Sequence, residues 1–188
     1  MVREDEQPAD RFLALLRPIE RDLEVYCRRL VWNEHDFRDA IQNAVMRGFK
    51  AFDRYHDDTN FRAWMFKILT NETFALNRKY ARAAKHEFHL DPEELAVLPA
   101  PQSASAETDW LAAPGALREA LDECLVAALQ TLTDTERAVL LLRAIGEFRY
   151  VDIAESLAIP LGSVMGNLSR ARLKMRNALQ RSQSRTAP

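Results

Sequence analysis

The hydrophobic positions of this chain fall into two blocks, and in both blocks they recur at three- and four-residue steps. This spacing places apolar side chains on one face of a helix. We expect three helices in the first block, between Asp10 and about Lys85, with a turn at residues 55–60. Each helix would be marginal alone, so we expect their apolar faces to pack together. The apolar positions are Phe12, Leu15, Leu16, Ile19, Leu23 and Tyr26, then Phe37, Ile41, Val45, Phe49 and Phe52, then Trp64, Ile68 and Phe74.

The second block runs from Arg118 to about Gln180 and begins with a helix-start signal. Thr133 followed three residues later by Glu136 has the spacing of a capping box, in which each side chain bonds the other residue's backbone N–H. The apolar run at residues 138–142 should be buried, and Gly146 fits the end of that helix. The pattern therefore predicts helices in both blocks.

The segment between the blocks has a different composition. Residues 87–117 contain four prolines and six acids but no Lys or Arg. This composition is typical of an extended, flexible linker. We therefore predict an all-α protein with two small helical domains, residues 1–86 and 118–188, joined by an acidic linker.

A helix-turn-helix is predicted between Tyr150 and Leu173. A short helix to Leu157 is interrupted at residues 158–160, and a second helix begins near Ser163. Two short helices joined by a tight turn are typical of this motif, whose second helix enters the DNA major groove. Charge alone favours a solvated amphipathic helix, but the turn pattern reverses that preference and favours DNA binding. We expect Val151, Ile153, Ala154 and Leu157 to face inward, and the DNA face to carry Ser163, Met165, Asn167, Ser169, Arg170, Arg172 and Lys174.

A second candidate DNA-binding segment runs from Phe61 to Asn71 and combines three aromatic residues with two cations. Aromatic rings that stack on unpaired bases, flanked by cations for the backbone, suit single-strand binding. The alternative is that the rings belong to the core, which we expect for Trp64 and Ile68, with Phe61, Lys67 and Asn71 exposed. The candidate strand-binding residues are Phe61, Arg62, Trp64, Lys67, Asn71, Arg78, Lys79 and Arg82.

Composition narrows the classes of function. The net charge is −2, so DNA binding must rest on local charge. Two cysteines without metal-ligand spacing suggest a reducing cytoplasm, and no apolar run approaches the ~18 residues that span a bilayer. Four scattered histidines and the absence of a Gly-rich phosphate loop give no sign of a metal, a cofactor or catalysis.

Residues 61–71, together with the stretch from residues 132–137 through residues 170–172, resemble the bacterial RNA polymerase sigma factors of the extracytoplasmic-function group. The resemblance implies a non-enzymatic transcription initiation factor whose first domain captures the unpaired minus-ten strand and whose second domain reads the minus-thirty-five duplex. It also implies binding of core polymerase at the largest-subunit clamp helices and the flap, with an anti-sigma factor as a further partner. We expect that partner to clamp both domains. The residues implied for clamp binding are Asp39, Gln42 and Asn43.

Some positions depart from the family pattern, and other functions stay open. The family often has an acid at the place of Asn43, Gly at Ala158 and Arg at Asn167. If position 158 needs a positive φ, alanine there would cost roughly 1 kcal/mol. Residues 76–80 match only loosely, which leaves the minus-ten sequence preference open. The alternatives are a sigma mimic that titrates an anti-sigma factor, a stand-alone helix-turn-helix regulator, which leaves the first block unexplained, and an enzyme with a metal site.

Overall fold

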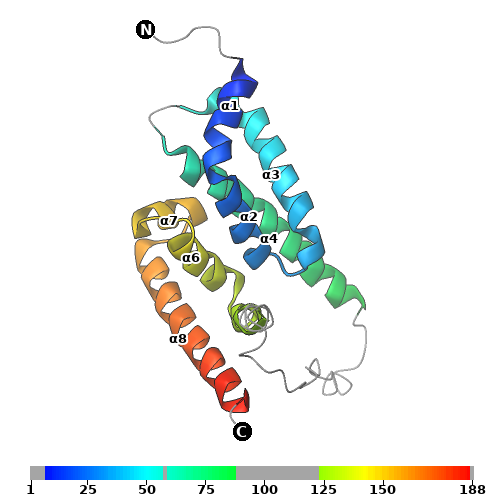
Figure 1. The fold of residues 1–188 in the computed structure, drawn as a ribbon, viewed down its shortest axis with the longest axis vertical. Coiled ribbons are helices and arrows are strands. Elements are labelled where there is room, and N and C mark those ends of the chain that lie inside the picture. Colours follow the sequence, from blue (N-terminus) through cyan, green and yellow to red (C-terminus); the bar gives the residue numbers. More distant parts are fainter. Residues whose placement is uncertain (1–6, 57–58, 88–122, 187–188) are drawn as a thin grey trace, which may run out of the picture.

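The computed structural model describes residues 7–56, 59–87 and 123–186, and every regular element in those ranges is a helix (Figure 1). The predicted all-α class is confirmed. The predicted linker, apart from Glu87, lies outside the described residues. The N-terminal domain contains α1 (Pro8–Leu16), η1 (Arg17–Ile19), α2 (Glu20–Leu30), η2 (Glu34–Asp36), α3 (Phe37–Ala51), η3 (Phe52–Arg54) and α4 (Phe61–Glu87). The C-terminal domain contains a helical segment, 123–130, then α6 (Asp134–Ala144), α7 (Tyr150–Leu157) and α8 (Leu161–Thr186).

The core of the N-terminal domain lies where α2, α3 and α4 pack against one another. Tyr26 of α2 and Phe66 of α4 are completely buried, with ring centroids 5.1 Å apart. The hydroxyl groups of Tyr26 and Thr70 share a hydrogen bond of 2.6 Å, so this buried polar atom is satisfied. The first apolar stretch folds as two helices instead of one, because Pro18 lies in η1 and lacks a backbone N–H for a continuous helix.

The capping box predicted at the start of α6 is confirmed. The Glu136 backbone N–H donates to Thr133 Oγ1 at 3.3 Å, and the Thr133 N–H donates to Glu136 Oε2 at 3.0 Å. The prediction that Gly146 marks the end of this helix is confirmed, because α6 ends at Ala144 with Ile145 as its C-cap, and the residue with positive φ is Glu147 (φ 59°). Glycine is required at position 146 by space: a Cβ there would lie 2.5 Å from the Phe148 ring and 2.6 Å from the Leu142 carbonyl oxygen.

The predicted helix-turn-helix is formed by α7 and α8. Ala158, which ends α7, has φ 53° and ψ 44°, so the position that the family pattern fills with glycine is left-handed here. The expectation that Val151 faces inward is wrong, because its side chain is 51% exposed. Ile153 and Ser156 form the buried side of α7, and Val151 lies about 200° around the helix from Ile153.

Replacing Ala158 by glycine is expected to stabilise the chain by roughly 1 kcal/mol, because glycine adopts the left-handed conformation without a Cβ penalty. Thermal or urea unfolding measures the change. The matched control is Ala154→Gly, one turn earlier in the same helix, which is expected to destabilise by about 1 kcal/mol because glycine weakens a helix interior. Effects of the same sign at both positions would contradict the strain assigned to Ala158.

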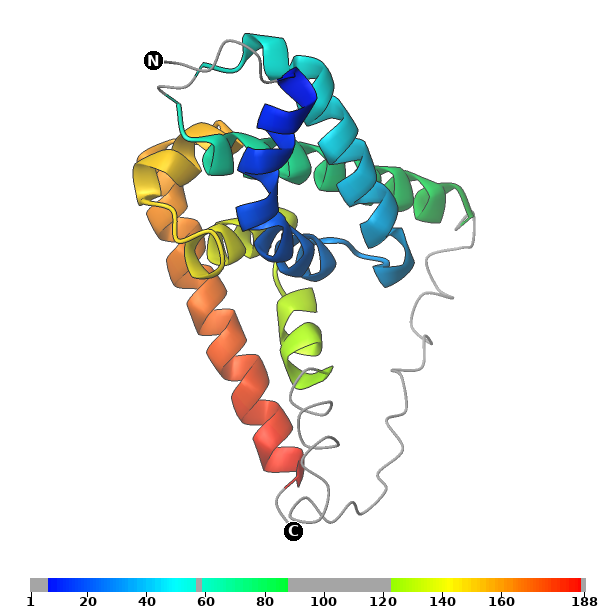
Figure 2. The same cartoon turned by 45° about the horizontal axis from the view of Figure 1, so that its top comes forward.

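The two domains pack directly on each other, with α6 and α7 against α2 and α4 (Figures 1 and 2). Phe148 packs edge-on against Phe66, with ring centroids 5.2 Å apart. Arg62 of α4 donates to the carbonyl oxygens of Ile145 at 2.9 Å and Gly146 at 3.3 Å, just beyond the end of α6. A cation at this place suits the negative end of the helix dipole.

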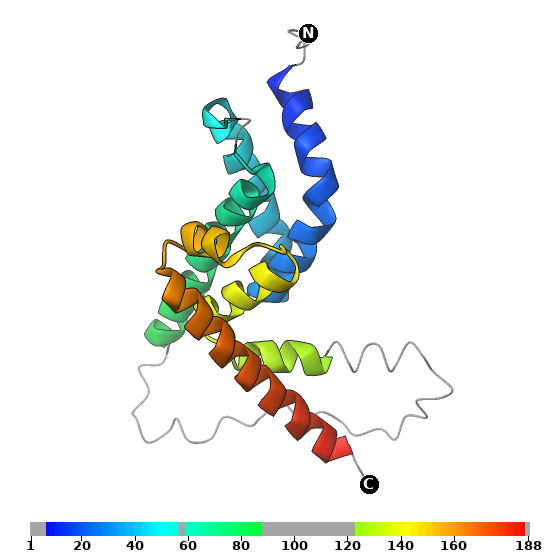
Figure 3. The same cartoon turned by 90° about the vertical axis from the view of Figure 1, so that its left-hand side faces the viewer.

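A second polar contact between the domains is centred on Asn77, which is completely buried. Its Nδ2 donates to the Leu30 carbonyl oxygen at 3.2 Å and to Asp134 Oδ1 at 3.3 Å. Its Oδ1 accepts from the Trp32 backbone N–H at 3.1 Å, and Trp32 Nε1 donates to the same Asp134 oxygen at 2.8 Å. Asn77 therefore links the end of α2, α4 and the start of α6. In contrast, the C-terminal half of α8 projects away from the N-terminal domain (Figure 3).

Candidate nucleic-acid interface

The predicted strand-binding residues all lie on α4, but the helix does not present them on one face. Phe61 is 7% exposed, so the expectation that it is exposed is wrong. It is the first residue of α4, and its ring packs edge-on against Phe12, Phe52 and Tyr55. Trp64 and Ile68, which were expected in the core, are only half-buried. Arg62 is engaged in the contact between the domains and with Asp22 at 2.8 Å.

Lys67 lines a pocket between α4 and α7 with a volume of about 380 Å³, called here the α4–α7 pocket. The rings of Tyr55 and Trp64 border it, with centroids 5.3 Å apart. Asn60 also lines it and caps α4, since its Oδ1 accepts from the Ala63 N–H at 3.2 Å. The remaining lining residues are Arg54, His56, Thr59 and Ala63 from the N-terminal domain and Asp152, Glu155 and Ser156 from the C-terminal domain.

Asn71, one turn after Lys67 on α4, lines a different cavity. This α3–α4 groove has a volume of about 450 Å³, and Asn71 is exposed in it. Arg54 lines both cavities, so Lys67 and Asn71 face neighbouring hollows with a cation between them. Glu72 in the groove is ion-paired with Arg47. The full lining is Arg47, Lys50, Ala51, Arg54, Ile68, Asn71 and Glu72.

The cations that α3 and η3 contribute to the α3–α4 groove were not predicted from the sequence. Arg47, Lys50 and Arg54 recur at three and four residues, a spacing that places them on one side of a helical segment. That spacing does not show that this side faces Asn71, because the contact between α3 and α4 forms only in the tertiary structure. Three other predicted strand-binding residues of α4 are exposed farther along the helix and line neither cavity: Arg78, Lys79 and Arg82.

The three residues predicted to bind the polymerase clamp lie together on α3. Asp39, Gln42 and Asn43 are all exposed. The next turn adds Met46, which is 51% exposed and was not predicted. Exposed methionine beside polar groups is typical of protein–protein contacts. This side of α3 therefore has the composition of a protein-binding surface.

The predicted recognition face lies on α8, whose opposite side is buried through Val164, Leu168 and Ala171. Asn167 Nδ2 donates to the Ser163 carbonyl oxygen at 2.8 Å, and Arg170 Nη2 donates to Asn167 Oδ1 at 2.9 Å. The exposed members of the face are Met165, Ser169, Arg170 and Arg172, and its half-buried members are Ser163, Asn167 and Lys174.

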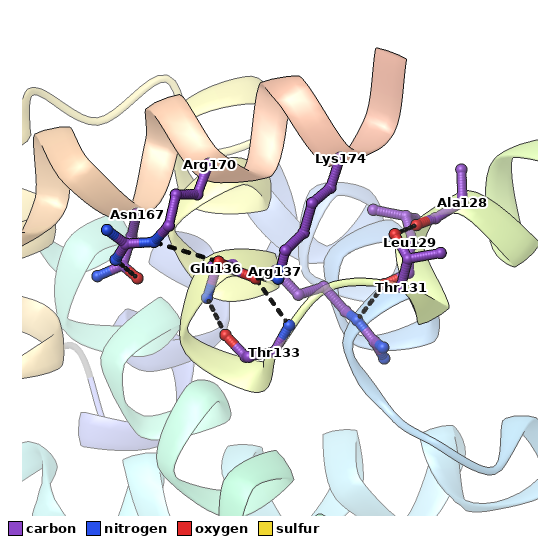
Figure 4. A network of polar contacts seen from close by, with 9 residues as sticks. All are labelled: Ala128, Leu129, Thr131, Thr133, Glu136, Arg137, Asn167, Arg170 and Lys174. Atoms are coloured by element: carbon purple, nitrogen blue, oxygen red, sulfur yellow. Dashed lines mark hydrogen bonds and ion pairs between the residues drawn. The ribbon is translucent and has the colours of Figure 1, made fainter. Parts of the chain in front are cut away.

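A buried carboxylate lies directly against this helix. Glu136, predicted only as a capping residue, accepts from Lys174 Nζ at 2.7 Å and lies 3.4 Å from Arg170 Nε (Figure 4). Burial alone would raise the pKa of Glu136, but the Lys174 ammonium and the Thr133 N–H outweigh it and hold that pKa below its ordinary value. Glu136 is therefore ionised at neutral pH.

Other chemistry is sparse in the described ranges. Three or more His, Cys, Asp or Glu side chains do not gather there in a metal-binding arrangement. No helix of the described part is long and apolar enough to cross a membrane. Burial raises the pKa of the Cys27 thiol to about 12, so this thiol is protonated and unreactive at neutral pH.

Two family models match the chain, one in each domain. Residues 15–83 match Sigma-70 region 2, and residues 122–175 match Sigma-70, region 4. The first match covers the α3 surface and the predicted strand-binding segment of α4. The second covers α6, α7 and the predicted recognition face of α8.

Curated relatives agree with both matches. The ECF RNA polymerase sigma factor SigG of Mycobacterium tuberculosis is 29% identical, over 91% of this chain and 49% of SigG. The ECF RNA polymerase sigma factor SigW of Bacillus subtilis is 28% identical, over 82% of this chain and 81% of SigW. The chain thus spans about half the length of SigG.

Two solved structures have a similar fold. One is the sigma factor RpoE in complex with the anti-sigma factor NepR from Bartonella quintana, with a TM-score of 0.69 and 24% identity over 90% of this chain and 96% of that chain. The other is CnrH in complex with the cytosolic domain of CnrY, with a TM-score of 0.63 and 24% identity over 90% of this chain and 87% of that chain. Family models in both domains, curated relatives and fold agree: the chain belongs to the sigma-70 family, in its extracytoplasmic-function group.

Proposed function

We propose that this chain directs promoter-specific transcription initiation as a sigma factor, by binding core RNA polymerase, melting the minus-ten element and reading the minus-thirty-five element. One observation carries the proposal: the same chain has a cation-lined pair of cavities along α4 and an outward-facing recognition helix, α8. No catalytic step and no cofactor are assigned to it. The energy for melting comes from binding unstacked bases better than paired ones.

The unpaired minus-ten strand would follow the two cavities along α4. Tyr55 and Trp64 offer ring surfaces, Lys67 and Arg54 offer positive charge for phosphates, and Asn71 offers an amide to a base edge. Each base–aromatic stack contributes about 1–3 kcal/mol. Extruding a base costs a few kcal/mol. A small number of such contacts therefore offsets the cost of opening the duplex while polymerase holds it.

The packed arrangement of the two domains does not suit strand binding. Asp152 and Glu155 of α7 line the same pocket as Lys67, so their carboxylates would repel DNA phosphates there. We propose that binding to polymerase moves α7 away from α4 and breaks the Arg62 contact. An anti-sigma factor, the kind of partner named in the RpoE–NepR structure, would keep the two domains together.

The remaining partners are assigned by surface. The exposed side of α3, with Asp39, Gln42, Asn43 and Met46, would contact the clamp helices of the largest polymerase subunit, and the C-terminal domain would contact the flap. Because Asn43 stands where the family often has an acid, this clamp contact would have one negative charge fewer than in family members with that acid. The α8 face would read the minus-thirty-five duplex in the major groove.

The test is transcription by bacterial core RNA polymerase with the purified full chain, on a pool of genomic promoter fragments. We expect discrete new start sites that core polymerase alone does not give. Binding to core without new transcripts would favour a sigma mimic that titrates an anti-sigma factor. Failure to bind core would contradict the proposal and favour a stand-alone helix-turn-helix regulator.

A further inference from the structure

Glu136 joins the start of α6 to the recognition helix, and it is 3% exposed. One side of its carboxylate accepts from the Thr133 N–H at 3.0 Å as part of the capping box. The same carboxylate contacts Lys174 at 2.7 Å and Arg170 at 3.4 Å, both from α8 (Figure 4). A capping role needs only the first of these contacts, so the pairing with α8 calls for its own explanation.

The contacts continue from Glu136 to the N-terminal turns of α8, which meet base edges in this motif. Arg170 contacts Glu136 through Nε and donates from Nη2 to Asn167 Oδ1 at 2.9 Å. Asn167 Nδ2 donates in turn to the Ser163 carbonyl oxygen at 2.8 Å. Both ends of the Asn167 amide are therefore fixed. An asparagine amide held in one orientation suits bidentate pairing with adenine, which needs one donor and one acceptor.

The same carboxylate changes the charge that α8 presents. The side chains of Arg170 and Lys174 are 59% and 41% exposed, so both can still reach a DNA backbone. Glu136 places one negative charge against these two cations. Because phosphate contacts give affinity without sequence information, partial neutralisation of the cations lowers the non-specific part of binding.

We propose that Glu136 is a positioning residue for duplex recognition: it orients Arg170 toward Asn167 and withholds part of the Arg170 and Lys174 charge from phosphates. This inference rests on the proposed reading of duplex DNA by α8. Its consequence is a higher ratio of specific to non-specific binding, obtained with a lower affinity for DNA of unrelated sequence.

Glu136→Gln separates this role from capping, because glutamine serves equally in a capping box. The probes are two duplexes of equal composition, one selected from a random pool by the wild-type full chain and one scrambled. Affinity for each is measured by fluorescence anisotropy over a salt series. We expect Glu136→Gln to bind the scrambled duplex about 3–10-fold more tightly at low salt, and the slope of log K against log salt to steepen by about 0.9, the value for one further phosphate contact. The ratio of selected to scrambled affinity should fall at least about threefold, since each good base contact contributes that much discrimination or more.

Glu147→Gln is the matched control, since it removes the same charge from an exposed position in the α6–α7 turn. It should leave the salt slope and the affinity ratio unchanged. Lys174→Gln gives a second, independent measurement in the chain that retains Glu136. We expect Lys174→Gln to reduce the slope of log K against log salt by less than half of ~0.9, which is the value for one cation that is fully available to a phosphate. A full loss would overturn the proposal even if Glu136→Gln were too unstable to assay.

The outcomes distinguish this inference from the function on which it rests. An unchanged slope and affinity ratio in Glu136→Gln would overturn the positioning role alone. Equal weakening on both duplexes, with a lower melting temperature, would show a purely structural role and also overturn it. A wild-type chain that selects no duplex, either free or loaded on core polymerase, would overturn the proposed duplex reading as well.

Discussion

Replacing Lys67 and Asn71 together by alanine is expected to reduce transcription from the chain's own promoters by about a hundredfold or more. Lys67 faces the α4–α7 pocket and Asn71 the α3–α4 groove, so the double variant removes one contact from each hollow. A good contact to a base edge contributes about 1–3 kcal/mol, and a hydrogen bond to a charged group such as a phosphate about 1.5–3 kcal/mol. Each 1.4 kcal/mol corresponds to a tenfold change, so losing both lowers open-complex formation by roughly two decades.

The measurement is run-off transcription with saturating chain on core polymerase, together with direct measurement of core binding. Core binding should persist, because the exposed side of α3 with Asp39 and Asn43 is untouched. A template with the minus-ten region already unpaired should recover part of the activity, because its melting cost is absent. Arg21→Ala, an exposed position on α2, removes one positive charge as the double variant does and should leave transcription unchanged. Equal transcription by the double variant and the wild type would contradict the proposed strand path.

Replacing Asn77 by alanine is expected to lower the free energy of unfolding by about 2–4 kcal/mol. The side chain is completely buried and takes part in three hydrogen bonds. Its removal leaves the buried Leu30 carbonyl and the part-buried Trp32 N–H without these partners, at about 1–3 kcal/mol for each group that stays unsatisfied. For a chain of this size the melting temperature should fall on the order of 10 °C.

A double-mutant cycle with Asp134→Ala separates the contact between domains from the contacts within the N-terminal domain. Because Asn77 and Asp134 are hydrogen-bonded, the two effects should not add, and the coupling should be about 0.5–3 kcal/mol. Asn177→Ala, an exposed asparagine of α8, serves as the control and should change stability by less than about 0.5 kcal/mol. Strict additivity would show that the Asn77–Asp134 contact does not form in solution, while a negligible effect of Asn77→Ala would contradict its burial.

Periodicity and local spacing predicted most of the fold because both report on short stretches of chain. The Thr133–Glu136 box and the break at Ala158 depend only on residues within one helical turn, and both were found where expected. Phe61 was misread because a local pattern shows that a helix has an apolar side but not which residues cover it, and its ring is covered by Phe12 and Phe52. Val151 was misread because it was placed on the buried side of α7, although it lies about 200° around that helix from Ile153.

The candidate site likewise contains residues that one helix alone indicates and residues that only tertiary packing brings together. The predicted recognition face belongs to one helix, α8, so its residues could be proposed from the sequence. The cations at Arg47, Lys50 and Arg54 meet Asn71 only because α3 packs beside α4. Glu136 reaches Lys174 across 38 positions of sequence, and no spacing within either helix indicates that pairing.

The placement of the two proposed DNA-binding surfaces has a consequence for the order of events at a promoter. In the packed arrangement the α8 face is directed outward, whereas carboxylates of α7 occupy the pocket beside Lys67. Under the proposed function, contact of α8 with duplex DNA would be available before the domains part, and capture of the single strand only afterwards. Contact with duplex DNA by the free chain and strand capture after core binding would then be separate kinetic stages, with release of the Arg62 contact by polymerase as the step between them.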